Sequence, residues 1–274
     1  MENKLLHQNQ HLLKNITHIF CDIDGTLLNG DSRLEKETIA EVKRIAKKIP
    51  FVLISGRSIP LMMPIHRQLG LDTPLIGANG SIFASASGET LSVNPLQKSD
   101  YMNLLALLAP RQEVAINVYT ETSWYTNRKD NAHVQKEEYI VEKQALELNK
   151  LEELQDTPIT KLILMGNEEI LKEIQTELEL KFSHLRAYHN YANYIEIFAY
   201  EAEKGLAIHR YITEHHLHES TIMAIGDSLI DASMFDYVKI KVAMDNAPVF
   251  LKEKANIIAP SNRKNGVAIL LEMM

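Results

Sequence analysis

Apolar stretches and helical patterns alternate along much of the chain, which predicts a parallel α/β sheet. Residues 16–23 are mostly apolar and end at the tight turn Asp24-Gly25-Thr26, a pattern typical of a strand buried on both faces. Residues 33–48 place apolar side chains at helical spacing, and the apolar run 51–54 predicts the next strand. Strand, helix and strand in this order predict a parallel βαβ unit.

The middle of the chain has a different pattern. After a second helix at 58–69 and a strand-turn-strand segment over 74–84, short strands and longer helices are mixed. The pattern predicts strands at 90–93, 114–119, 123–127, 160–165, 185–189 and 194–198, and helices at 98–109, 130–148 and 168–182. We expect an α+β module here, inserted into the α/β domain.

The α/β pattern returns at residue 204. It predicts helices at 204–216 and 229–235, strands at 221–225, 240–243 and 256–258, and two closing helices. We therefore expect a discontinuous Rossmann-like core made of 1–84 and 200–274, and an inserted α+β cap over 85–199. Residues 1–15 are polar and are expected to be a frayed or lightly docked extension.

Composition excludes several classes of protein. Of the 274 residues, 45% are hydrophobic and 24% charged, which is unlike a disordered, collagen-like or coiled-coil chain. With 29 basic against 36 acidic residues the net charge is −7, which argues against the basic stripe that nonspecific nucleic-acid binding needs. We expect no nucleic-acid partner.

Cysteine content and hydropathy indicate the compartment. The single cysteine, Cys21, cannot form an internal disulfide, and the N-terminal residues lack the apolar stretch of a signal peptide. The apolar run at 104–109 is far too short to span a membrane. We expect a cytoplasmic protein with no membrane partner, present as a monomer or a weak homo-oligomer.

Two acidic residues at the end of the first strand suggest a metal or phosphate site. Asp22 and Asp24 are two positions apart, so both carboxylates can project to the same side, at the sheet edge where open α/β sheets bind ligands. Two crowded acids repel each other unless a cation separates them or one is protonated, and Mg²⁺ prefers such carboxylates. Gly25 permits the tight turn that follows.

Three later segments place further polar residues at the same edge. They are Ser55-Gly56-Arg57 after the second strand, Lys204-Gly205 at a predicted helix start, and Gly226-Asp227 with Asp231 after the strand at 221–225. An Asp-x-Asp sequence alone is usually a solvated turn. Four segments that converge on one edge favour a phosphate-handling site.

These four segments resemble the motifs of the haloacid dehalogenase-like superfamily, in its Cof-type sugar-phosphatase-like branch. Asp22-Ile-Asp-Gly-Thr-Leu-Leu matches the first motif, Ser55-Gly-Arg the second, Lys204-Gly the third and Gly226-Asp-x-x-x-Asp231 the fourth. The resemblance extends from about residue 17 to the C-terminus. It implies a Rossmann-like three-layer core with a large cap inserted after the third strand.

The resemblance also implies roles for the acidic residues. Asp22 would attack phosphorus and form an aspartyl-phosphate. Asp24 would protonate the leaving alcohol and then act as base for the hydrolytic water. Mg²⁺ would be held by the Asp22 carboxylate, the main-chain carbonyl of Asp24, and Asp227.

Phosphate-binding groups follow from the same resemblance. Ser55 and the main-chain amides of Ile23 and Gly56 would donate to the phosphate, and Lys204 would place a cation beside it. Asp231 would orient Lys204 or the waters of the metal, although it could also be an acid favoured by a helix N-terminus.

Three further positions bear on the substrate. Relatives in this branch usually carry Asn where this chain has Ile230. An Ile side chain cannot donate a hydrogen bond, so we expect a weaker or differently supported phosphate site. Asn79 resembles a residue of the branch near the substrate, or is an Asn suited to a left-handed turn. Arg57 would reach the substrate or, as we favour, brace the loop after Ser55.

The sequence thus predicts a Mg²⁺-dependent phosphomonoesterase for a small phosphorylated metabolite, which closure of the cap would shield from water. A phosphotransferase or phosphomutase with the same nucleophile is an alternative. Because of Ile230, a catalytically weak phosphosugar-binding sensor is another. The histidines do not suggest a metal site, because His209 and His216 lack the i,i+4 spacing of a helical zinc site.

Overall fold

The computed structural model describes residues 9–141, 143–148 and 150–274. The chain forms two compact units, one of Met1–Leu91 with Glu203–Met274 and one of Ser92–Ala202. We call these the core unit and the inserted unit. The first eight residues of the expected N-terminal extension lie outside the described residues.

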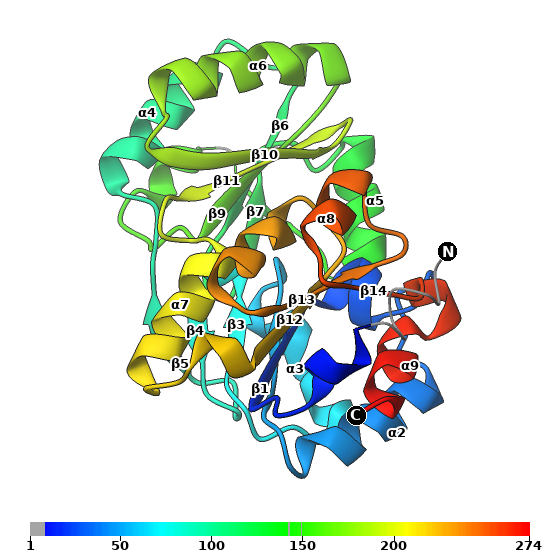
Figure 1. The fold of residues 1–274 in the computed structure, drawn as a ribbon. Helices are drawn as coiled ribbons and strands as arrows, with labels where there is room; N and C mark the ends of the chain where they lie inside the picture. Colours follow the sequence, from blue (N-terminus) through cyan, green and yellow to red (C-terminus); the bar gives the residue numbers. More distant parts are fainter. Residues whose placement is uncertain (1–8, 142, 149) are drawn as a thin grey trace. The chain divides into compact units, whose positions relative to one another are not determined.

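An eight-stranded sheet organises the core unit (Figure 1). Its order is β14-β13-β12-β1-β2-β3-β4-β5, in which β14 to β3 pair in parallel and β4 is antiparallel to β3. The strands are β1 (His18–Cys21), β2 (Phe51–Ile54), β3 (Leu75–Gly77), β4 (Ile82–Ala84), β5 (Thr90–Val93), β12 (Ile222–Gly226), β13 (Ile240–Met244) and β14 (Ile257–Ala259). The central strand β1 thus lies between β2 and β12, which carry the second and fourth motifs.

Helices cover both faces of this sheet. They are α2 (Lys36–Ala46), α3 (Ile59–Leu69), α7 (Lys204–Glu214), α8 (Val249–Lys254), α9 (Gly266–Glu272) and the 3₁₀ segment η6 (Ile230–Tyr237). Figure 1 shows α2, α3 and α9 on one side of the sheet and α7 on the other. The prediction of a parallel α/β core is confirmed by this architecture.

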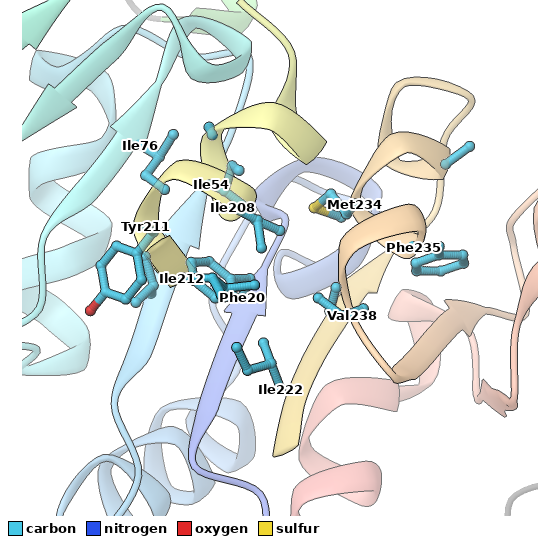
Figure 2. Close-up of a cluster of buried hydrophobic side chains, with 14 of the residues drawn as sticks. Phe20, Ile54, Ile76, Ile208, Tyr211, Ile212, Ile222, Met234, Phe235 and Val238 are labelled. Carbon is cyan, nitrogen blue, oxygen red and sulfur yellow. The ribbon is translucent and has the colours of Figure 1, made fainter. Parts of the chain in front are cut away.

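Burial on both faces explains why the strands are continuously apolar. Phe20 of β1 and Ile54 of β2 pack against Ile208 and Tyr211 of α7, while Phe235 of η6 closes the same cluster (Figure 2). The rings of Phe20 and Tyr211 meet edge to face with centroids 5.2 Å apart. This packing fixes α7 and η6 against the sheet. The third motif lies at the start of α7, and the fourth motif ends in η6.

The inserted unit is built on a six-stranded sheet with the order β10-β11-β9-β6-β7-β8. Its strands are β6 (Ala115–Tyr119), β7 (Trp124–Thr126), β8 (Leu146–Glu147), β9 (Lys161–Met165), β10 (Leu185–Tyr191) and β11 (Tyr194–Ala199), and its helices are α4 (Lys98–Leu108), α5 (Ala132–Val141) and α6 (Glu168–Lys181). In Figure 1, α4 and α6 lie on one face of this sheet. The unit is therefore an α+β module.

One predicted element of the inserted unit is wrong. The helix expected over 130–148 ends at Val141, and Leu146–Glu147 form strand β8 beside β7. The main-chain amide of Leu148 donates to the carbonyl of Thr126 at 2.9 Å. Pairing with β7 therefore takes the main-chain groups that a longer helix would have used, and residue 142 lies outside the described residues.

The described part of the N-terminal extension is docked on the core unit. Leu13, in the 3₁₀ segment η1 (Gln10–Leu13), is buried, and Asn9 donates its side-chain amide to the carbonyl of Asn256 at 2.7 Å. Within the described ranges, none of the helices has both the length and the apolarity needed to cross a bilayer.

Candidate active site

The site begins where β1 ends. Asp22 follows Cys21 directly, and its main-chain amide still donates to the carbonyl of Ile225 on β12 at 3.0 Å. The chain then curls into the short helical segment η2 (Ile23–Leu27), where Gly25 has φ of +80°. Asp22 is 5% exposed, so its carboxylate is buried at the carboxyl edge of the parallel strands.

Lys204 brings a cation to this carboxylate. Its Nζ lies 2.6 Å from Oδ1 of Asp22 and 2.7 Å from Oδ1 of Asp231, and the side chain is 4% exposed. Lys204 is the first residue of α7, and Gly205 lets that helix start come close to η6: a Cβ on Gly205 would lie 2.2 Å from the carbonyl oxygen of Ser233. The third motif therefore needs glycine for packing and lysine for charge.

Asp231 is the most highly bonded acid of the site. Its Oδ1 accepts from Lys204, while its Oδ2 accepts from the amides of Asp227 and Ser228 at 3.0 and 2.9 Å and from the Ser228 hydroxyl at 2.8 Å. The residue is fully buried. Asp231 thus both orients Lys204 and fixes the loop that carries Asp227.

Asp227 is held by residues from two other segments. Thr26 donates its hydroxyl to Oδ1 at 2.8 Å, and Asn246 donates Nδ2 to Oδ2 at 3.2 Å. Asn246 also donates to the carbonyl of Gly25 at 2.8 Å. Asn246 was not among the residues predicted from the sequence, although its place just after β13, the next parallel strand, could have suggested it.

Three carboxylates form an acidic cluster. Asp22, Asp227 and Asp231 each offer an oxygen within 4.8 Å of the others. Burial raises the pKa of Asp22 well above its usual range, and the neighbouring Asp231 adds to this, while Lys204 opposes it. Burial and then Asp231 raise the pKa of Asp227 to about 7. Burial and the neighbouring acids therefore disfavour the ionised forms of Asp22 and Asp227, and Lys204 offsets this effect only in part.

These residues fit a hard divalent cation. Mg²⁺ prefers carboxylate oxygens and relieves the repulsion between buried acids. Asp22 and Asp227 are suited as ligands. Asp231 is less suited, because four donors already occupy its two oxygens. The pKa of Lys204 is raised because Asp22 and Asp231 outweigh the opposing effect of burial, so the lysine stays charged beside the site.

The carboxylate of Asp24 does not join this cluster. It accepts two hydrogen bonds from Arg57, from Nε to Oδ2 at 2.7 Å and from the terminal Nη2 to Oδ1 at 2.6 Å. Asp24 still lies close enough to the cluster to contribute to the raised pKa of Asp227, so Arg57 binds its carboxylate at the border of the site.

The loop after β2 lies beside η3 (Ala78–Gly80). Ser55 is buried, and its Oγ accepts from the main-chain amide of Arg57 at 3.2 Å. Asn79 has φ of +56° and donates its main-chain amide to the carbonyl of Ser55 at 2.9 Å. The Oδ1 of Asn79 would lie 3.1 Å from a Cβ on Gly56, so its side-chain amide packs directly on that glycine.

Two of the predicted positions have apolar side chains. Ile23 is fully buried directly after Asp22, so its expected contribution is limited to its main-chain amide. Ile230, the first residue of η6, is 7% exposed and donates nothing through its side chain.

The family model for haloacid dehalogenase-like hydrolases matches residues 19–271. The chain belongs to this family. The resemblance inferred from the four motifs is confirmed, and family membership makes the protein a hydrolytic enzyme.

Similar proteins cover almost the whole of this haloacid dehalogenase-like hydrolase. A protein of Haemophilus influenzae is 28% identical over 256 residues, covering 93% of this chain and 96% of its own length. The phosphoglycolate phosphatase of Staphylothermus marinus is 26% identical over 256 residues, covering 92% of this chain and 94% of its own. A 5-amino-6-(5-phospho-D-ribitylamino)uracil phosphatase of Bacillus subtilis is 26% identical, covering 93% and 97%.

A solved structure shares the fold. The crystal structure of a haloacid dehalogenase-like hydrolase from Bacteroides thetaiotaomicron superposes with a TM-score of 0.84 at 24% identity. The match covers 94% of this chain and 98% of the other. The α/β fold class is therefore confirmed independently of the motifs.

Proposed function

We propose that this hydrolase is a Mg²⁺-dependent phosphomonoesterase that transfers the phosphoryl group of a small metabolite to Asp22 and then to water. The observation that carries the proposal is the buried pair of Asp22 and Lys204, with 2.6 Å between Oδ1 and Nζ. A buried carboxylate held at one oxygen by a charged lysine is oriented for attack, and the lysine opposes the rise in its pKa that burial causes.

The first step breaks one bond and forms another. An oxygen of Asp22 bonds to phosphorus as the bond between phosphorus and the leaving alcohol oxygen breaks. Asp24 gives a proton to that oxygen. In the second step water attacks phosphorus, Asp24 takes a proton from the water, and the bond to Asp22 breaks to release phosphate.

In the structure the Asp24 carboxylate is bound by another side chain. Both of its carboxylate oxygens accept from Arg57, at 2.7 and 2.6 Å. Proton transfer by Asp24 therefore requires this pair to open when substrate binds. Its hydrogen bonds to Asp24 and to the Ser55 hydroxyl support a bracing role for Arg57 in the enzyme without substrate.

Phosphate capture has to be local, because the net charge of −7 gives no general attraction for anions. We assign it to Lys204, the Ser55 hydroxyl and the main-chain amides of Ile23 and Gly56. Asn79, whose side-chain amide packs on Gly56, is suited to support this group where Ile230 offers no donor.

Asp22, Asp227 and the main-chain carbonyl of Asp24 would hold the divalent cation. When bound, Mg²⁺ neutralises charge on the transferring phosphoryl group and helps to align it. Relief of repulsion within the acidic cluster supports this assignment, since burial and neighbouring acids raise the pKa values of Asp22 and Asp227.

Small phosphorylated metabolites, sugar phosphates among them, are the substrate class that we propose. The relatives named for phosphoglycolate and for a phosphoribitylamino-uracil support this class. A screen of phosphate release over sugar phosphates, nucleotides, flavin mononucleotide and pyridoxal phosphate, with Mg²⁺ present, would identify the substrate. Transfer to a second sugar in place of free phosphate would select the phosphotransferase alternative.

The matched pair of variants Asp22→Asn and Asp31→Asn tests the proposal. Asp22→Asn removes the nucleophile with little change in shape, so turnover of an aryl phosphate is expected to vanish. Asp31 is an exposed acid nine residues away, and Asp31→Asn is expected to retain wild-type activity. Wild-type turnover by Asp22→Asn would rule out the proposed mechanism.

A further inference from the structure

The side chain of Asp227 is held on both of its carboxylate oxygens by uncharged donors. Thr26 donates to Oδ1 at 2.8 Å and Asn246 to Oδ2 at 3.2 Å. Each carboxylate oxygen has two lone pairs, so each keeps one for another ligand. Hydroxyl and amide donors fix the direction of the carboxylate without neutralising the charge that would attract a cation.

Asn246 is itself fixed by main-chain groups. Its Nδ2 donates to the carbonyl of Gly25 at 2.8 Å, and its Oδ1 accepts from the main-chain amide of Asn262 at 3.1 Å. Asn262 in turn donates its side-chain amide to the carbonyl of Leu28 at 2.8 Å. The Asn246 amide is thus bonded to the turn after β1 and to the segment after β14, as well as to Asp227.

Gly25 packs directly against the same carboxylate of Asp227. A Cβ at this position would lie 2.3 Å from Oδ2 of Asp227, and φ of +80° also favours glycine. The carboxylate therefore lies directly against the main chain of the turn that carries Asp22 and Asp24.

We propose that Asn246 is a positioning residue for the divalent cation, acting with Thr26 to set the rotation of the Asp227 carboxylate. The inference rests on the proposed function, since it takes Asp227 as a ligand. The terminal torsion of an aspartate is otherwise broad, so an unheld carboxylate loses more freedom when it binds a cation. Residues that orient a metal ligand commonly change metal affinity about 10- to 100-fold when they are removed.

Mg²⁺ titration calorimetry without substrate tests the proposal on Asn246→Ala. We expect the Kd for Mg²⁺ to rise about 10-fold or more. Asn246 is exposed, so truncation leaves the hydrophobic core intact. In an activity assay the same variant should need more Mg²⁺ for half-maximal rate, with kcat close to wild type once Mg²⁺ is saturating.

Asn256→Ala is the matched control. Asn256 lies at the amino end of the parallel strand β14, whereas Asp227 follows the carboxyl end of β12. The Oδ1 of Asn256 accepts from the main-chain amide of Lys241 at 2.9 Å. The Asn256→Ala variant therefore loses a similar side-chain hydrogen bond, but at the other end of the strands from Asp227. We expect its Kd for Mg²⁺ to stay within 2-fold of wild type, a margin of about 0.4 kcal/mol.

Two results would overturn the proposal. Asn246→Ala could bind Mg²⁺ as tightly as wild type, or Asn256→Ala could lose the same affinity, which would indicate general loosening. Should Asn246→Ala not fold, Thr26→Val removes the donor to Oδ1 with little change in shape, and unchanged Mg²⁺ affinity there contradicts the same account. Because binding is measured without turnover, the result is independent of whether Asp22→Asn is inactive.

Discussion

The ammonium group of Lys204 lies 2.6 Å from Oδ1 of Asp22, although 182 positions separate the two residues in the chain. The pair joins the end of β1 to the start of α7, and Asp231 completes it from the other side at 2.7 Å. A buried cation between two buried carboxylates both orients the proposed nucleophile and limits the repulsion around it.

Removing the positive charge of Lys204 should reduce both the stability and the activity of the protein. In Lys204→Met the carboxylates of Asp22 and Asp231 stay buried without their partner, which typically costs about 3–5 kcal/mol of unfolding free energy. Urea unfolding measures that loss, and turnover should fall by about 100-fold or more, as for other groups that stabilise developing charge. Wild-type stability and activity in Lys204→Met would show that the pair is unimportant.

Gly205 provides a separate test of how Lys204 is placed. A Cβ there would lie 2.2 Å from the carbonyl oxygen of Ser233, so Gly205→Ala must push α7 away from η6. We expect a loss of about 1–3 kcal/mol in stability and a fall in kcat. Gly166→Ala is the control, because its Cβ would meet no atom closer than 3.4 Å. Equal behaviour of the two variants would contradict this packing argument.

In the metal-free protein, burial of Asp227 should make the stability of the fold depend on pH. Burial, and then Asp231, raise its pKa from 3.8 to about 7, so the native state keeps a proton that the unfolded chain has already released. Stability therefore falls as pH rises between these two values, by about 1.4 kcal/mol for each unit of pKa difference. The Asp227→Asn variant has no carboxyl group at this position, so it should not lose this part of the stability as pH rises. Thermal unfolding in chelator at pH 5 and pH 8 compares the two proteins.

The same experiment with Mg²⁺ added makes a second comparison. At pH 8, where Asp227 is ionised, Mg²⁺ should raise the Tm of the wild type clearly more than that of Asp227→Asn. At pH 5 protons compete with the cation, and the increase should shrink. A Tm increase that is equal in both proteins, or independent of pH, would place the cation elsewhere.

Much of the fold could be predicted because its signals are local. The apolar run of β1 and the helical spacing of α2 each follow from side chains close in sequence. The helix predicted over 130–148 failed because strand β8 depends on pairing with β7, some 20 positions earlier in the chain. No glycine or proline marks the point where α5 ends.

The site was predictable only in part, for a similar reason. Asp22 and Lys204 lie at an element's end or start, where topology alone brings them to one edge of the sheet. The bonds from Asn246 to Asp227 and from Arg57 to Asp24 depend on side-chain directions after the strands have ended. Those directions are set by η2 and by the loops around it, which have no simple period.

Trapping the phosphorylated enzyme tests the central claim most directly. Asp24→Asn should form the aspartyl-phosphate from an activated aryl phosphate but hydrolyse it slowly, since the base for the second step is missing. Mass spectrometry of the acid-quenched, digested protein should then find one phosphoryl group on the peptide that contains Asp22, and none in the Asp22→Asn/Asp24→Asn double variant. Aryl phosphate turnover with no phosphoryl group on Asp22, or with the group on another residue, would contradict the account.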